Sequence, residues 1–108
     1  MGYIANIDFK IKVKENKEEE LQKYLEQIED IDFSEIEINK GYLEGDFYGN
    51  YYEEDWYKFL KDIISYIEDD EKIFCDGEDY TIWAFHKKKN QWYECETEVV
   101  ITKAIKII

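Results

Sequence analysis

The segment from Tyr3 to Val13 constrains the fold more than any other part of the chain. Every second residue in it is apolar, and from Asn6 onward the residues between are polar or charged. Side chains of a strand point alternately to its two faces, so this pattern predicts a strand with one buried and one exposed face. A half-buried strand is typical of an antiparallel sheet that is covered on one face only.

Two segments have the apolar spacing of amphipathic helices. In residues 17–29 the apolar positions fall on one helical face, and Asn16 with Glu19 fits an N-cap and its capping-box partner. Residues 53–67 begin with three acidic residues, which the helix dipole favours, and continue with a strong apolar stripe. We expect this second helix to be the better buried of the two.

The other segments have the pattern of short strands joined by turns. Residues 34–40 and 42–50 flank Gly41 and predict a hairpin, and the runs IFC, YTIWAFH and WYECETEVVI are separated by the turns DGED and KKKNQ. The last residues, TKAIKII, fit either a closing strand or a short helix.

The order of these segments is strand, helix, two strands, helix and three strands. It predicts one α+β domain over residues 1–108, with two helices on one face of an antiparallel sheet of about five or six strands. A ferredoxin-like plait is one topology that this order allows.

The chain is strongly acidic. It has 27 Asp and Glu residues against 14 Lys and no Arg, a formal charge of −13, yet 44% of its residues are hydrophobic. That hydrophobic content indicates a folded protein rather than a disordered acidic tail. Because phosphates repel such a surface, direct binding to nucleic acid is disfavoured, and a basic protein is the expected partner.

The charge is also unevenly distributed. Residues 15–80 contain 23 acidic residues and 6 lysines, a net charge of −17, whereas the remainder of the chain carries +4. Self-repulsion of this size lowers stability, so we expect it to serve solubility or a partner.

No residue pattern indicates an enzyme. His86 is the single histidine and stands beside three lysines, without a nucleophile placed to use it as a base. Cys75 and Cys95 are flanked by acids, which disfavour a reactive thiolate, and we expect both to be reduced and buried. The acidic runs lack the spacing of a calcium loop, so we expect no catalytic residue, metal or cofactor.

Aromatic residues alternate with acids between residues 42 and 56, and Tyr is favoured in protein interfaces. Carboxylates with aromatic rings between them can imitate the phosphates and bases of a nucleic acid. The expected contact residues are Glu53, Glu54, Asp55, Asp69, Asp70, Glu71, Glu78 and Asp79, with Tyr48, Tyr51 and Tyr52 as anchors.

The stretches MGYIANIDFKIKVKENKEEELQKYL and YIEDDEKIFCDGEDYTIWAFHKKKNQWYE resemble the ends of small uncharacterised α+β proteins of phages and mobile elements. The most recognisable part is Gly77, Glu78, Asp79 and Trp83. This resemblance implies a genomic neighbourhood in which acidic inhibitors of host nucleases, including anti-CRISPR proteins, are common. It transfers no functional residue.

We therefore expect a non-enzymatic protein that inhibits a basic nucleic-acid-binding partner, such as a nuclease or an effector complex, by charge mimicry. No apolar run approaches the roughly 18 residues that span a bilayer, so we expect it in the host-cell cytosol and not at a membrane. The alternatives are an immunity protein that neutralises a toxin, a small ligand-binding domain, and a homodimer that pairs through a sheet edge or an aromatic surface.

Overall fold

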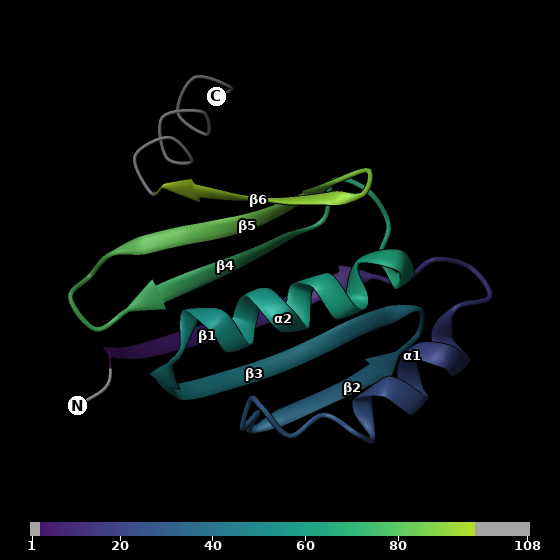
Figure 1. Cartoon of the computed structure of the whole chain (residues 1–108), viewed down its shortest axis with the longest axis horizontal. Helices are drawn as coiled ribbons and strands as arrows, with labels where there is room; N and C mark the ends of the chain where they lie inside the picture. Colours follow the sequence, from purple (N-terminus) through teal and green to yellow (C-terminus); the bar gives the residue numbers. More distant parts are fainter. Residues whose placement is uncertain (1–2, 97–108) are drawn as a thin grey trace.

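The computed structural model describes residues 3–96, which form an α+β domain (Figure 1). Its elements are β1 (Tyr3–Lys12), α1 (Glu18–Leu25), β2 (Glu35–Asn39), β3 (Tyr42–Tyr51), α2 (Glu53–Ile63), a short 3₁₀ helix η1 (Ile64–Tyr66), β4 (Lys72–Gly77), β5 (Ile82–Lys88) and β6 (Gln91–Glu96). The element order predicted from the sequence is confirmed. The predicted strand 92–101 extends past these residues, and the segment 102–108 lies outside them.

The six strands form one antiparallel sheet in the order β2-β3-β1-β4-β5-β6. This six-strand order is not that of a ferredoxin-like plait, so that expectation is wrong. The difference arises because β4 does not end the sheet: tight turns after β4 and β5 add two more antiparallel strands beyond it.

The alternation in β1 has the predicted effect. Ala5, Ile7, Phe9 and Ile11 are buried, and the polar residues between them are exposed. Two glycines on neighbouring strands make room for the ring of a β1 residue. A Cβ atom on Gly45 would collide with the Phe9 ring, and one on Gly77 would collide with Tyr3.

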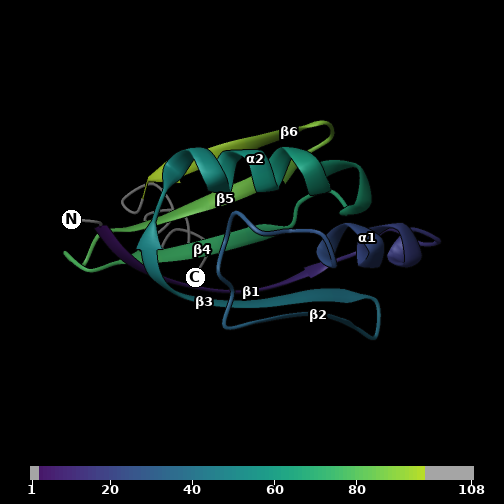
Figure 2. The same cartoon turned by 60° about the horizontal axis from the view of Figure 1, so that its bottom comes forward.

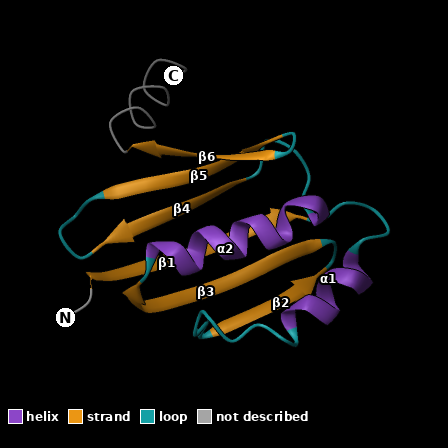
Figure 3. Cartoon of the chain, viewed as in Figure 1, coloured by secondary structure: helices purple, strands orange, loops and turns teal. Residues whose placement is uncertain are grey.

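Both helices lie on the same side of the sheet, as Figure 2 shows. α2 crosses the middle of this face and buries Trp56, Phe59 and Ile63, while α1 lies near β2 and buries Leu21 and Leu25 (Figure 3). The other face of the sheet has no helix over it. We call it the open face; it carries the polar residues of β1 and their neighbours on the adjacent strands.

The helices differ from the prediction in where they end and in how α1 begins. α1 ends at Leu25, and its N-cap is Lys17, which makes no side-chain cap hydrogen bond. Asn16 instead has a φ of 69°. An N-cap residue needs extended backbone to place its side chain over the first turn, so a left-handed Asn16 cannot form the predicted capping box. The second predicted helix is divided, because α2 ends at Ile63, η1 follows, and Ile67 forms a bridge with Val13.

None of the helices in residues 3–96 has the length and apolar character needed to cross a membrane.

Candidate protein-interaction surface

The predicted contact residues lie at two opposite ends of the sheet. Glu53, Glu54 and Asp55 form the first turn of α2, next to the end of β3. The turn that follows Gly77 is at the same end, because Gly77 pairs with Ala5 and Tyr51 pairs with Tyr3 (Figure 1). Asp69, Asp70 and Glu71 precede β4 and therefore lie at the other end. No single patch contains all eleven residues.

Two of the three acids at the start of β4, Asp69 and Glu71, are engaged by donor groups, whereas Asp70 accepts no hydrogen bond from His86. The Lys87 ammonium lies 2.7 Å from Asp69 Oδ1, and His86 Nε2 lies 3.4 Å from Asp70 Oδ1. Glu71 accepts a hydrogen bond of 2.7 Å from the Lys12 backbone N–H. The hydrogen bond from Lys87 holds the pKa of Asp69 below its usual value. Asp69 and Glu71 therefore serve the fold at this end, which weakens the case for them as contact residues.

The prediction that Lys87 belongs to the turn KKKNQ is wrong. This lysine belongs to β5, its residue exposure is 0%, and its side chain points to the helix-covered face of the sheet. Its ammonium group therefore pairs with Asp69 of the same molecule and does not add positive charge to the surface.

The turn between β4 and β5 also uses its acids internally. Tyr3 Oη donates a 2.5 Å hydrogen bond to Asp79 Oδ1, and the Ile4 N–H donates a 2.8 Å bond to Glu78 Oε1. The bond from Tyr3 holds the pKa of Asp79 below its usual value. Both acids remain exposed, so they can still face a partner while they tie this turn to β1.

The three predicted tyrosine anchors divide into two kinds. Tyr51 is half-buried and packs edge-on against Trp83, with 5.1 Å between ring centroids. Tyr48 is 70% exposed and Tyr52 is 55% exposed. Exposed aromatic side chains of this size are candidates for a contact with another molecule, whereas Tyr51 belongs to the rim of the core.

A larger group of carboxylates lies on the side of the sheet formed by β2 and β3, with two lysines beside it: Lys10 is opposite Glu44, and Lys58 pairs with Asp30. We call this group the acidic edge; it comprises Glu29, Asp30, Asp32, Glu35, Glu37, Glu44 and Asp46. Glu35 pairs with Asp46 and Glu37 with Glu44, so four of these side chains project together from the open face. This group was not among the predicted contact residues, although the alternation in EIEIN already places Glu35 and Glu37 on one face.

The acidic edge continues onto the centre of the sheet. Asp8 on β1 lies directly opposite Asp46. The hydrogen bond between these two carboxyl groups raises the pKa of Asp8, and partial burial and the Asp46 charge raise it further. Like charges directly opposite each other on neighbouring strands are unfavourable, so this pair destabilises the sheet when both groups are ionised.

A hollow of about 340 Å³ adjoins the acidic edge. Its walls come from three elements: the segment that precedes β2, the final part of β3, and the start of α2. They supply the carboxylates of Asp30, Asp32 and Asp55 and the exposed rings of Tyr48 and Tyr52. No lysine lines the hollow. Of the predicted contact residues it contains three, and it adds two carboxylates that were not predicted.

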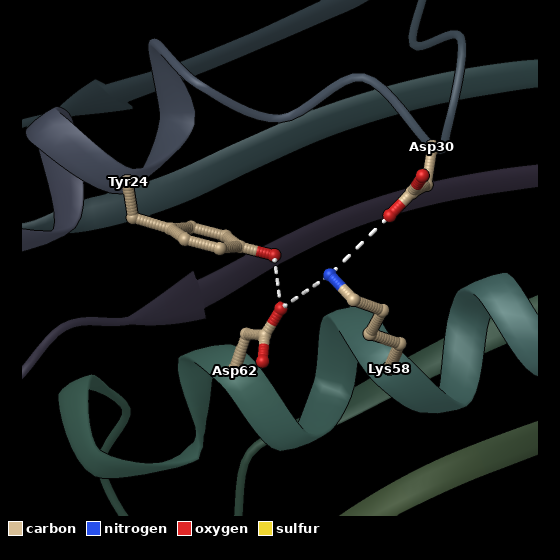
Figure 4. Close-up of polar contacts among 4 residues, drawn as sticks. All are labelled: Tyr24, Asp30, Lys58 and Asp62. Atoms are coloured by element: carbon tan, nitrogen blue, oxygen red, sulfur yellow. Dashed lines mark hydrogen bonds and ion pairs between the residues drawn. The ribbon is translucent and has the colours of Figure 1, made fainter.

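A polar network holds one wall of the hollow in place (Figure 4). The Lys58 ammonium lies 3.3 Å from both Asp30 Oδ2 and Asp62 Oδ2, and Tyr24 Oη donates a 3.0 Å bond to Asp62. The network joins α1, the segment before β2, and α2. Its ion pairs are largely exposed, so each adds little to stability.

The two cysteines, which were considered as possible nucleophiles, form no disulfide with each other. Cys75 is buried, and burial raises its thiol pKa, whereas Cys95 is only partly buried; both are free. Within residues 3–96, no three His, Cys, Asp or Glu side chains converge in a way that would hold a metal ion.

Comparison of the chain with protein-family models, with curated proteins and with solved structures gives no match.

Proposed function

We propose that this is a non-catalytic binding protein that inhibits a basic, nucleic-acid-binding protein by occupying its nucleic-acid site. The observation that carries the proposal is the acidic edge, where Glu35, Glu37, Glu44 and Asp46 project together from the open face and Asp30 and Asp32 line the adjoining hollow. An inhibitor of a nuclease or of a nucleic-acid-guided effector complex, as phages make against host defence, is the class of activity that we favour.

The spacing of the carboxylates suits this role. Neighbouring strands are about 4.8 Å apart, and residues two apart along a strand are roughly 6.7 Å apart. Glu35, Glu37, Glu44 and Asp46 therefore form a small grid of negative charge, with its charges separated by distances that a lysine- or arginine-lined groove can match. Complementary charge of this kind steers association and selects a basic partner.

The proposal is tested by reversing charge on the acidic edge. Glu35 and Glu37 are both exposed, so the Glu35→Lys, Glu37→Lys variant should fold. The matched control is Glu15→Lys with Asp76→Lys, because these residues are also exposed, the change in net charge is the same, and neither belongs to the acidic edge. Each protein is used to capture proteins from a nuclease-treated lysate of a candidate host, and captured proteins are identified by mass spectrometry.

We expect the wild type and the control to capture the same basic protein, and the Glu35→Lys, Glu37→Lys variant to lose it by at least tenfold. Loss of capture by both double variants would mean that net charge alone attracts the partner. Capture of a partner without a nucleic-acid-binding surface would contradict the proposal and favour an immunity role.

A further inference from the structure

One stretch of the sheet has a strand edge that no other strand covers. β2 begins at Glu35, opposite Asp46, whereas β3 continues to Tyr51. Within the described residues nothing pairs with Phe47–Tyr51 on the side away from β1. We call this stretch the free β3 edge.

The chain leaves the sheet at this point because of Phe33. Its ring lies 5.3 Å from the ring of Phe59 and 5.6 Å from that of Trp56, both on α2. This packing draws the segment before β2 toward the helix side and ends the strand. The Ser34 N–H still donates a 2.8 Å bond to the Asp46 carbonyl, which is the last backbone bond on this side of β3.

The direction of the backbone groups follows from the alternation of the strand. The Asp46 carbonyl points to the β2 side, so the N–H and C=O groups of Tyr48 and Asn50 point the same way, away from β1. An uncovered row of such groups is a template for another strand. Lysine, proline or a bulge would block the edge, but its residues are Phe, Tyr, Gly, Asn and Tyr.

The surroundings of the free β3 edge define what kind of strand would fit. The hollow opens beside it, with the Asp30, Asp32 and Asp55 carboxylates and the rings of Tyr48 and Tyr52 in its walls. Carboxylates bind a lysine or arginine side chain directly, and the face of a tyrosine ring attracts the same cations. An acidic strand would be repelled here.

We propose that the free β3 edge binds an extended, basic segment of the partner protein as an added strand, with a Lys or Arg side chain of that segment in the hollow. This inference rests on the proposed function, since it specifies how the basic partner is held. Backbone hydrogen bonds supply general affinity in this mode of recognition, and the hollow supplies the selection for a cation.

The experiment uses the whole protein and a synthetic eight-residue peptide of alternating Lys and Thr, with blocked ends. The control peptide has the same sequence and charge but carries an N-methyl group on every residue, so neither of its edges can donate the backbone hydrogen bonds of an added strand. Binding is followed by amide hydrogen exchange and by NMR shifts. We expect the unmodified peptide to slow exchange of the Tyr48 and Asn50 amides at least tenfold, and the methylated peptide to bind at least tenfold more weakly.

Two variants of one residue separate pairing from folding. Asn50→Pro removes an N–H that points to the free β3 edge and leaves the β1 side intact, while Asn50→Ala keeps the N–H. We expect the proline variant to lose the peptide and the alanine variant to keep it. If circular dichroism shows that the proline variant is unfolded, strand pairing is tested instead by comparing the binding of the two peptides to the wild-type protein.

Equal binding of both peptides, or exchange at Tyr48 and Asn50 that the peptide leaves unchanged, would overturn the inference. Slow exchange of these amides without peptide, together with a dimer mass in solution, would also overturn it, because a second copy would then occupy the edge. None of these results would affect the proposed function, which is tested separately by charge reversal at Glu35 and Glu37.

Discussion

Packing at Gly45 gives a sharp test of the fold that displays the acidic edge. A Cβ atom at Gly45 would meet the ring of Phe9, a buried side chain on the neighbouring strand. Extra volume in a packed core costs about 1–3 kcal/mol. Replacing glycine with alanine also lowers the entropy of the unfolded chain, which offsets about 0.4–1 kcal/mol. For Gly45→Ala we therefore expect a net loss of about 1–2 kcal/mol in the free energy of unfolding.

Gly49→Ala is the matched control, since Gly49 lies on the same strand and the same face. There the nearest atom to the added carbon is Phe47 Cζ at 3.8 Å, an ordinary contact. This variant should be neutral or slightly more stable. Urea and thermal unfolding followed by circular dichroism measure both, and each kcal/mol corresponds to a shift of about 4–8 °C in Tm for a domain near this size.

The cause of the Gly45→Ala loss is tested in a second background. Phe9→Leu removes the ring that the new methyl group would meet, so Gly45→Ala should cost about 1 kcal/mol less there than in the wild type. Equal stability of Gly45→Ala and Gly49→Ala, or full additivity with Phe9→Leu, would refute the packing argument.

Three further outcomes follow from buried or crowded polar groups. The pKa of Asp8 is higher in the folded protein than in the unfolded chain, so ionised Asp8 lowers the stability of the fold at pH values above the folded pKa. This destabilisation disappears as the pH falls through the folded pKa toward the pKa of the unfolded chain. Asp8→Asn should therefore raise the unfolding midpoint at neutral pH and lose this advantage in acid; an advantage that persists below pH 3 would contradict the linkage to Asp46. In the native protein a thiol reagent should label Cys95 well before Cys75, whose thiol is buried, and equal labelling would show that β4 opens readily. Lys87→Met should keep or raise the unfolding midpoint, since a side chain of similar length fills the same buried space without a charge, and a large fall would show that the ion pair is required.

Much of the fold is predictable because its signal is local. The two-residue period of β1 and the stripe of α2 each follow from the burial of one face, and both appear in the structure. The sheet order could not be predicted from such patterns, because alternation marks which face of a strand is buried but not which strand lies beside it. The position of Asn16 shows the same limit: its residue type suits both an N-cap and a left-handed turn, and the connection to α1 decides between them.

The proposed interaction surface is harder to predict from the sequence than the fold. The predicted acidic contact residues are consecutive acids in the sequence. In the structure, the consecutive acids before β4 lie beside Lys87, His86 and a backbone N–H of the same molecule. The carboxylates of the acidic edge are spaced along strands, so they come together only when β2 pairs with β3. The burial of Lys87 was not predictable for a related reason. Its long side chain reaches Asp69 from a buried position in β5, and the residue type alone suggests an exposed position.

The central claim is that this protein and nucleic acid compete for one site on a basic partner. The most direct measurement is a titration of the protein into a complex of the captured partner with fluorescently labelled nucleic acid, repeated from low to high salt. We predict complete displacement of the nucleic acid, with an apparent affinity that falls steeply as salt screens the carboxylates of the acidic edge. A ternary complex that retains the nucleic acid, or an affinity that salt does not change, would contradict the account.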